Sequence, residues 1–138
     1  MKIIVIDGQG GKMGKCVVEQ LKRARPELEL IALGTNSIAT SAMLKAGASA
    51  GATGENPVIV NSRDADIIIG PIGIVIADAL LGEITPAMAV AVGSSPAQKI
   101  LIPSSRRHQI VAGCRELPLG DYIKDVVARV EMLLDGKG

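Results

Sequence analysis

The stretch that decides the fold is Lys-Ile-Ile-Val-Ile-Asp-Gly-Gln-Gly-Gly-Lys-Met-Gly-Lys, residues 2–15. Residues 2–6 form a β-branched apolar run, which is typical of a strand buried on both faces. The glycine-rich half then leads into apolar residues at helical spacing, and Pro26 ends this pattern. The stretch therefore predicts a strand, a tight turn and a helix, the unit that opens a parallel sheet.

The same alternation continues to the end of the chain. We expect further strands at residues 29–33, 48–54, 66–70, 99–103 and 109–112, and further helices at residues 37–46, 58–63, 72–81, 86–92 and 119–134. Two helices have start signals, a capping side chain followed by proline, at Asn56-Pro57 and Thr85-Pro86. Because no linker or repeat divides the chain, we predict one α/β domain over residues 1–138. It is Rossmann-like, with three layers and a mostly parallel sheet of about five to six strands.

Composition argues against several kinds of partner. The 138 residues include 15 basic and 14 acidic side chains, and this net charge of +1 has no field to attract DNA or an anionic membrane. Tyr122 is the sole aromatic residue, so bases have no stacking platform. Cys16 and Cys114 are too few for a disulfide framework. With no signal-peptide core or membrane span, we expect a soluble, cytoplasmic protein.

The glycine-rich turn has the composition of a phosphate-binding loop. Gly8 permits a tight turn, and Gly14 lets the helix pack close to the strand. Gly10 and Gly11 let the backbone approach a pyrophosphate, which the N–H groups and the helix dipole then face. A tight turn with a purely structural role is the alternative. The candidate cofactor-binding residues here are Gly8, Gln9, Gly10, Gly11, Lys12, Met13 and Gly14.

These residues carry two resemblances. The motif Gly8-x-x-Gly11-x-Met13-Gly14 resembles the turn of dihydrodipicolinate reductases and related NAD(P)-dependent enzymes, and residues 64–69 resemble the fourth strand of many dehydrogenases. Both imply a dinucleotide-binding fold. Over nearly its whole length, especially at residues 6–14, 34–37 and 70–73, the chain also resembles a bacterial domain-of-unknown-function family, which implies no particular activity. Asp7 departs from the dehydrogenase pattern, and it either hydrogen-bonds the N–H groups of the turn or has a ligand or catalytic role.

The end of the second predicted strand bears on the choice of nucleotide. An NAD site normally has Asp or Glu there, about 20 residues beyond the glycines, to hold the ribose hydroxyls. This chain has Gly34, Thr35, Asn36 and Ser37 instead. With no carboxylate to repel a 2′-phosphate, the last three become candidate cofactor-binding residues, and NADP is favoured over NAD. The same three residues could equally cap the helix that follows.

Two later loops complete the candidate site. Gly70, Pro71 and Gly73 follow a predicted strand, where dehydrogenase backbone lies against the ribose or nicotinamide. Ser104, Ser105 and Arg106 follow the next strand and are candidates for an anionic substrate group or a neighbouring subunit. We expect His108 and Glu83 to be solvated and Cys114 to be buried as a small hydrophobe. No catalytic residue or metal ligand set is assigned.

The sequence thus predicts a nucleotide-binding protein, with NADP(H) or NAD(H) at the first turn. As an enzyme it would be an NAD(P)-dependent oxidoreductase, with a partner subunit completing the site because these residues leave no room for a substrate domain. A nucleotide sensor without turnover and a structural or interaction protein with an unoccupied turn are the alternatives. The aliphatic content favours a homo-oligomer, a dimer or larger.

Overall fold

Five parallel strands form one sheet in the order β3-β2-β1-β4-β5. In the computed structural model, which describes residues 1–104 and 109–136, the strands are β1 (Ile3–Asp7), β2 (Leu30–Gly34), β3 (Ala50–Thr53), β4 (Ile67–Pro71) and β5 (Gln98–Ile102). Central β1 pairs with β2 on one side and β4 on the other, so Ile3 is aligned with both Leu30 and Ile67. The chain runs outward from β1 to β3 and then returns to β4 on the other side of β1, so the strand order reverses between β1 and β4. Ligands of open α/β sheets bind at such a switch point, beyond the carboxyl ends of the strands.

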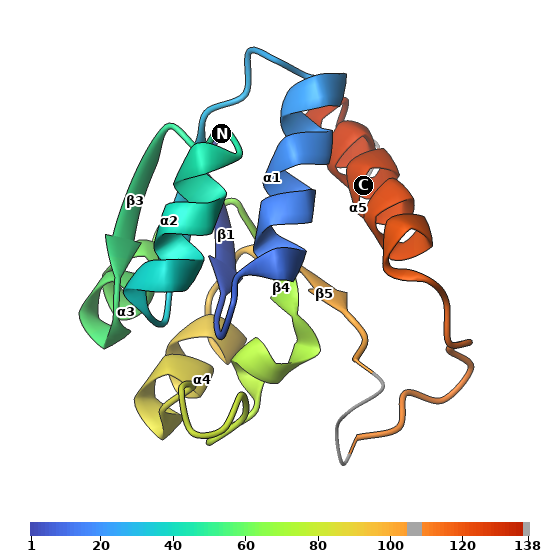
Figure 1. Cartoon of the computed structure of the whole chain (residues 1–138). Coiled ribbons are helices and arrows are strands. Elements are labelled where there is room, and N and C mark those ends of the chain that lie inside the picture. The colour runs from blue at the N-terminus through green and yellow to red at the C-terminus, as the bar shows by residue number, and fades with distance from the viewer. Residues whose placement is uncertain (105–108, 137–138) are drawn as a thin grey trace.

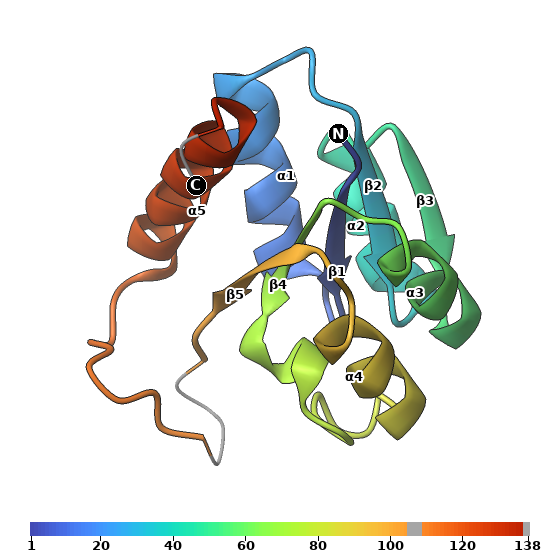
Figure 2. The same cartoon turned by 180° about the vertical axis from the view of Figure 1, so that it is seen from behind.

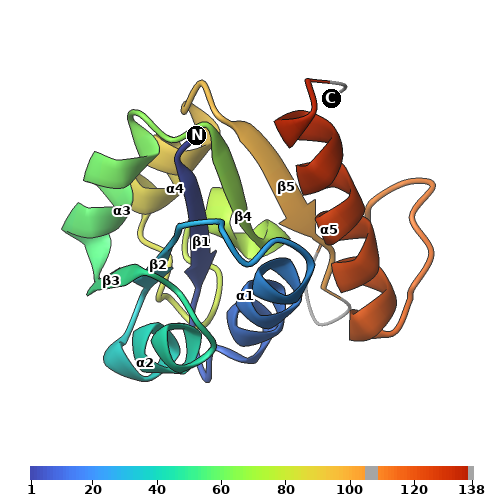
Figure 3. The ribbon, with the colours of Figure 1, turned by 90° about the horizontal axis from the view of Figure 1, so that it is seen from above.

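Helices cover both faces of the sheet and make three layers (Figures 1 and 2). On one face lie α1 (Lys12–Ala24), α2 (Ser37–Lys45) and α5 (Leu119–Leu134), and on the other lie α3 (Glu55–Ser62) and α4 (Pro86–Gly93). The view from above shows the sheet between these two groups (Figure 3). A short 3-10 helix, η1 (Ile72–Val75), follows β4. This architecture confirms the predicted fold class, with five strands in the described part of the chain, all parallel.

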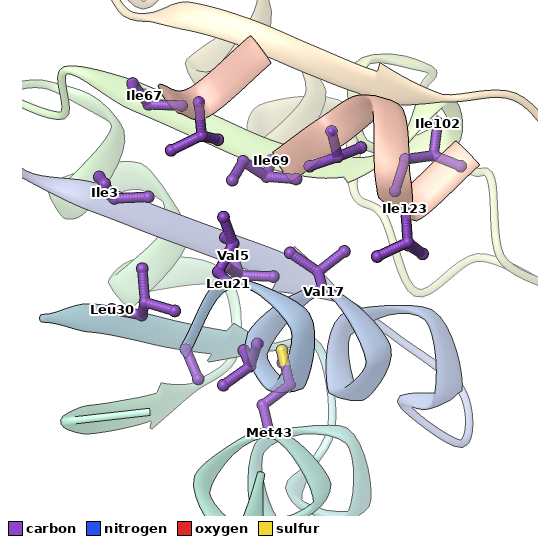
Figure 4. Close-up of a cluster of buried hydrophobic side chains, with 14 residues drawn as sticks. Ile3, Val5, Val17, Leu21, Leu30, Met43, Ile67, Ile69, Ile102 and Ile123 are labelled. Atoms are coloured by element: carbon purple, nitrogen blue, oxygen red, sulfur yellow. The ribbon is translucent and has the colours of Figure 1, made fainter. Parts of the chain in front are cut away.

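The core has two parts because side chains on a strand point alternately to opposite faces of the sheet. Val5 of β1 packs with Leu21 of α1 and Ile123 of α5 on one face (Figure 4). Ile4 and its neighbours pack on the other face against α4 and the segment before it. All five residues of β1 are buried, as expected for a central parallel strand. The position of β1 therefore places the glycine turn at the middle of the sheet edge.

Two predicted elements differ from the structure. Residues 109–112 form no strand, since Ile110 is 96% exposed and no neighbouring strand pairs with this segment in the described part of the chain. Residues 72–81 form only η1 and then a turn, because Asp78, Leu80 and Leu81 have φ of 65°, 57° and 56°, a left-handed conformation that a helix cannot contain. The second difference matters most, because residues 76–84 form a loop that reaches the glycine-rich turn.

One of the two predicted helix starts is confirmed. Thr85 caps α4, since its Oγ1 accepts a hydrogen bond from Met88 N at 3.1 Å. The Asn56-Pro57 start is wrong, because α3 begins at Glu55 after Gly54, which has a φ of 105°. Proline is tolerated within the first turn, where the N–H groups have no partner inside the helix. Within residues 1–104 and 109–136, no helix is both long and apolar enough to cross a membrane.

Candidate nucleotide site at the glycine-rich turn

The turn between β1 and α1 closes on itself and is packed against its surroundings. Gly11 N donates to Gly8 O at 2.9 Å, and Gly11 has a φ of 74°, which favours glycine. A Cβ at Gly8 would lie 2.6 Å from Thr35 Oγ1, and a Cβ at Gly14 would lie 2.9 Å from Asp7 Cβ. The fold itself therefore requires glycine at positions 8, 11 and 14.

Gly10 differs from these three glycines. It has no left-handed φ, it is exposed, and a Cβ built on it would meet nothing within 4 Å. Neither its conformation nor its packing explains why a glycine stands at this position. Its backbone faces open space at the edge of the sheet.

Asp7 ties the turn to the start of α1. Its carboxylate accepts hydrogen bonds from two backbone groups, Gly8 N at 2.8 Å and Gly14 N at 2.6 Å. Burial raises the pKa of Asp7, and these two hydrogen bonds oppose the rise without cancelling it. The hydrogen-bonding interpretation of this unusual aspartate is confirmed.

Glu83 reaches the turn from the loop between η1 and α4, although we expected it to be solvated. Its Oε1 accepts hydrogen bonds from Gln9 N at 3.0 Å, Thr35 Oγ1 at 2.5 Å and Asn36 Nδ2 at 2.8 Å. Burial raises the pKa of Glu83, but these three hydrogen bonds outweigh it and leave the pKa below its usual value. Glu83 is therefore ionised at neutral pH. Sequence reasoning missed it because its partners lie 47, 48 and 74 residues away.

The end of β2 has both a capping role and a role in holding Glu83. Asn36 Oδ1 accepts from Ala39 N at 3.0 Å, which confirms the cap of α2. Asn36 Nδ2 also donates to Gln9 O at 2.9 Å, so this side chain connects the turn to α2. Ser37 is exposed as the first residue of α2. The premise that no carboxylate stands here is wrong, because Glu83 supplies one from another part of the chain.

The start of α1 leaves backbone donors available. Among the described residues, no group accepts a hydrogen bond from the N–H of Gly10, Lys12 or Met13. Lys12 is exposed and Met13 is half-buried at the first two positions of the helix. These N–H groups lie at the positive end of the helix dipole, which favours an anion.

The segment that joins the end of β4 to η1 lies at the same edge but beneath the surface. Gly70, Pro71 and Gly73 are all buried. Leu80, which is 5% exposed, approaches both Gly8 and Gly73 and so separates the two loops. A cofactor contact of residues 70–73 stays a prediction.

The residues predicted to bind an anion in the loop after β5 are only partly described by the structure. Ser105, Arg106 and His108 lie outside the described residues. Ser104 is half-buried and lines a small cleft with Ile72 and Tyr122. Cys114 is exposed rather than buried, because the preceding residues 109–112 do not form the predicted strand. In the part of the chain that the structure describes, no three His, Cys, Asp or Glu residues lie together as metal ligands.

This geometry defines a class of protein, a parallel α/β protein with a glycine-rich turn after its central first strand. The chain belongs to the family described as a domain of unknown function, DUF3842, whose model matches residues 2–135. A solved structure similar in fold is the dodecameric FMN-dependent UbiX-like decarboxylase from Escherichia coli O157:H7. It has 18% sequence identity and a TM-score of 0.43 over 99% of this chain and 95% of that chain. No curated protein matches the chain.

Proposed function

We propose that the protein binds a nicotinamide dinucleotide, NAD(H) or NADP(H), with the pyrophosphate against the turn of residues 8–14. The observation that carries this proposal is Gly10, whose small size serves no purpose within the fold. A glycine that faces open space lets a ligand approach the backbone closely. Beside it stand the N–H groups of Lys12 and Met13, which no described residue engages.

The position of the turn in the sheet supports the same proposal. Because β1 is central and the strand order reverses between β1 and β4, the turn lies where α/β sheets bind nucleotides. In Figure 1 the carboxyl ends of the strands point downward, and the segment between β4 and α4 lies below them. A dinucleotide extending from the turn would lie along this edge.

We assign no reaction to the site. As an oxidoreductase, the protein would use the dinucleotide for hydride transfer, and a partner subunit would supply substrate-binding residues. Exposed apolar side chains support the accompanying proposal of a homo-oligomer, since Ile110 is 96% exposed and Val90 is 67% exposed. Light scattering at several protein concentrations tests this second proposal, and a monomer at all of them would contradict it.

Calorimetric titration with NAD⁺, NADH, NADP⁺ and NADPH tests the binding proposal. The informative variant is Gly10→Ala, which adds one methyl group where the pyrophosphate would lie. Its matched control is Gly120→Ala, a glycine in α5 that also has open space around it. We expect Gly10→Ala to weaken dinucleotide binding by at least about tenfold without lowering the unfolding temperature, and Gly120→Ala to bind normally.

Two results would overturn the proposal. The first is that the wild-type protein binds none of the four dinucleotides. The second is that Gly10→Ala binds them as tightly as the wild type does, which would mean that the ligand lies elsewhere. ATP and FMN in the same titration show whether another nucleotide takes the place of the dinucleotides.

A further inference from the structure

We infer that Glu83 selects between the two dinucleotides, accepting a ribose hydroxyl of NAD(H) and rejecting the 2′-phosphate of NADP(H). The inference rests on the proposed function and deepens it. It also reverses the preference for NADP that the residues after β2 suggest on their own.

The first argument is where the carboxylate stands. Glu83 Oε1 is bound by Thr35 and Asn36, the two residues that directly follow β2. The same oxygen accepts from Gln9 N within the glycine turn. A dinucleotide site holds its ribose with an acidic side chain at this junction of the second strand and the turn. Glu83 occupies that junction although it comes from the loop before α4.

The second argument concerns the hydrogen-bonding groups of the site that no described residue engages. All three hydrogen bonds to Glu83 end on Oε1, and no described residue donates to Oε2. Glu83 accepts from Gln9 N and from two residues that follow β2, whereas the available N–H groups of Lys12 and Met13 are at the start of α1. The carboxylate therefore leaves the N–H groups of Lys12 and Met13 to a pyrophosphate, while Oε2 can accept a hydroxyl.

The third argument is charge. Asp7 lies close enough to Glu83 for the charge of one to influence the other. No lysine or arginine within residues 1–104 and 109–136 forms an ion pair with either carboxylate. A 2′-phosphate at this position would face negative charge that no described lysine or arginine pairs with, and like charges at such distances repel. A ribose with free hydroxyls meets no such repulsion.

The loop also holds Glu83 in place. Its neighbour Ile84 is 1% exposed, and Leu80 is 5% exposed beneath the turn. Asp78 N donates to Ile84 O at 2.7 Å, which closes the loop on itself. The side chain is thus presented by a segment anchored on both sides, and the protein has little further ordering to do when a ribose binds.

The test compares dissociation constants for NADH and NADPH in the wild type, in Glu83→Gln and in the control Glu29→Gln. Glutamine has the shape of glutamate and keeps an oxygen for Thr35, but it has no charge. Glu29 is an exposed glutamate before the opposite end of β2. We expect the wild type to bind NADH at least about tenfold more tightly than NADPH, and Glu83→Gln to reduce this ratio by about tenfold. The control should keep the wild-type ratio.

A second measurement needs no variant. NADH that lacks the 2′-hydroxyl of its adenosine ribose should bind the wild type several-fold less tightly than NADH. Equal binding of the two would overturn the inference, as would tighter binding of NADPH by the wild type or an unchanged ratio in Glu83→Gln. In each of these cases a dinucleotide still binds, so the proposed function stands. Failure of the wild type to bind any dinucleotide overturns both.

Discussion

Replacing Asp7 by alanine should destabilise the fold strongly, although Asp7 is a buried acid whose pKa is raised. The substitution removes both acceptors from Gly8 N and Gly14 N, and these glycines are buried, so water cannot easily replace them. An orphaned buried donor costs about 1–3 kcal/mol, or about 2–6 kcal/mol for the two. Relief of the buried charge acts in the opposite direction, which leaves an expected loss of about 2–4 kcal/mol.

Thermal unfolding followed by circular dichroism measures this loss. For a chain of this size, a loss of 2–4 kcal/mol lowers the unfolding midpoint by at least about 6 °C. Asp7→Asn keeps one acceptor oxygen and should lie between the wild type and Asp7→Ala. Asp64→Ala, which removes an exposed ion pair with Lys2, is the surface control and should cost less than about 1 kcal/mol. A midpoint for Asp7→Ala within about 2 °C of the wild type would refute the view that Asp7 holds the turn.

Three further predictions concern pH, the core and a helix cap. Because the folded pKa of Asp7 is raised, the stability that its protonation contributes is fully present below the unfolded pKa and is lost as pH rises through the folded pKa. Urea unfolding at pH values between these two pKa values should show this loss of stability in the wild type and not in Asp7→Asn. Leu21→Ala, at a fully buried position, should cost about 2–5 kcal/mol by urea unfolding, and a loss below about 1 kcal/mol would show that the core closes over the cavity. Thr85→Ala removes the cap of α4 and should cost about 1 kcal/mol, with Thr85→Ser, which keeps the hydroxyl, close to the wild type in the same unfolding experiment.

Much of the fold could be predicted because its signals are local. Strand β1 needs only a β-branched run, and its predicted start lies one residue before the observed one. Helix α1 needs only apolar residues at helical spacing, and it lies between the glycines and Pro26 as predicted. Thr85 was predicted as a cap residue, and Asn36 was one of three candidates for the cap of α2, since a cap acts within one helical turn. The predicted strand at residues 109–112 failed for the opposite reason. A strand requires a neighbour, and no local pattern shows whether one is present.

The amino-acid sequence by itself determined the parallel α/β architecture and the place of the glycine turn at the end of a buried strand. Burial on both faces and helical periodicity depend on the pattern of neighbouring residues, so they can be predicted directly from the sequence. The tertiary structure alone decided the chemistry around that turn. It brought Glu83 to the end of β2 through a loop with left-handed residues at Asp78, Leu80 and Leu81. Such a conformation depends on packing against the rest of the fold, so a carboxylate absent from the strand end in sequence is present there in space.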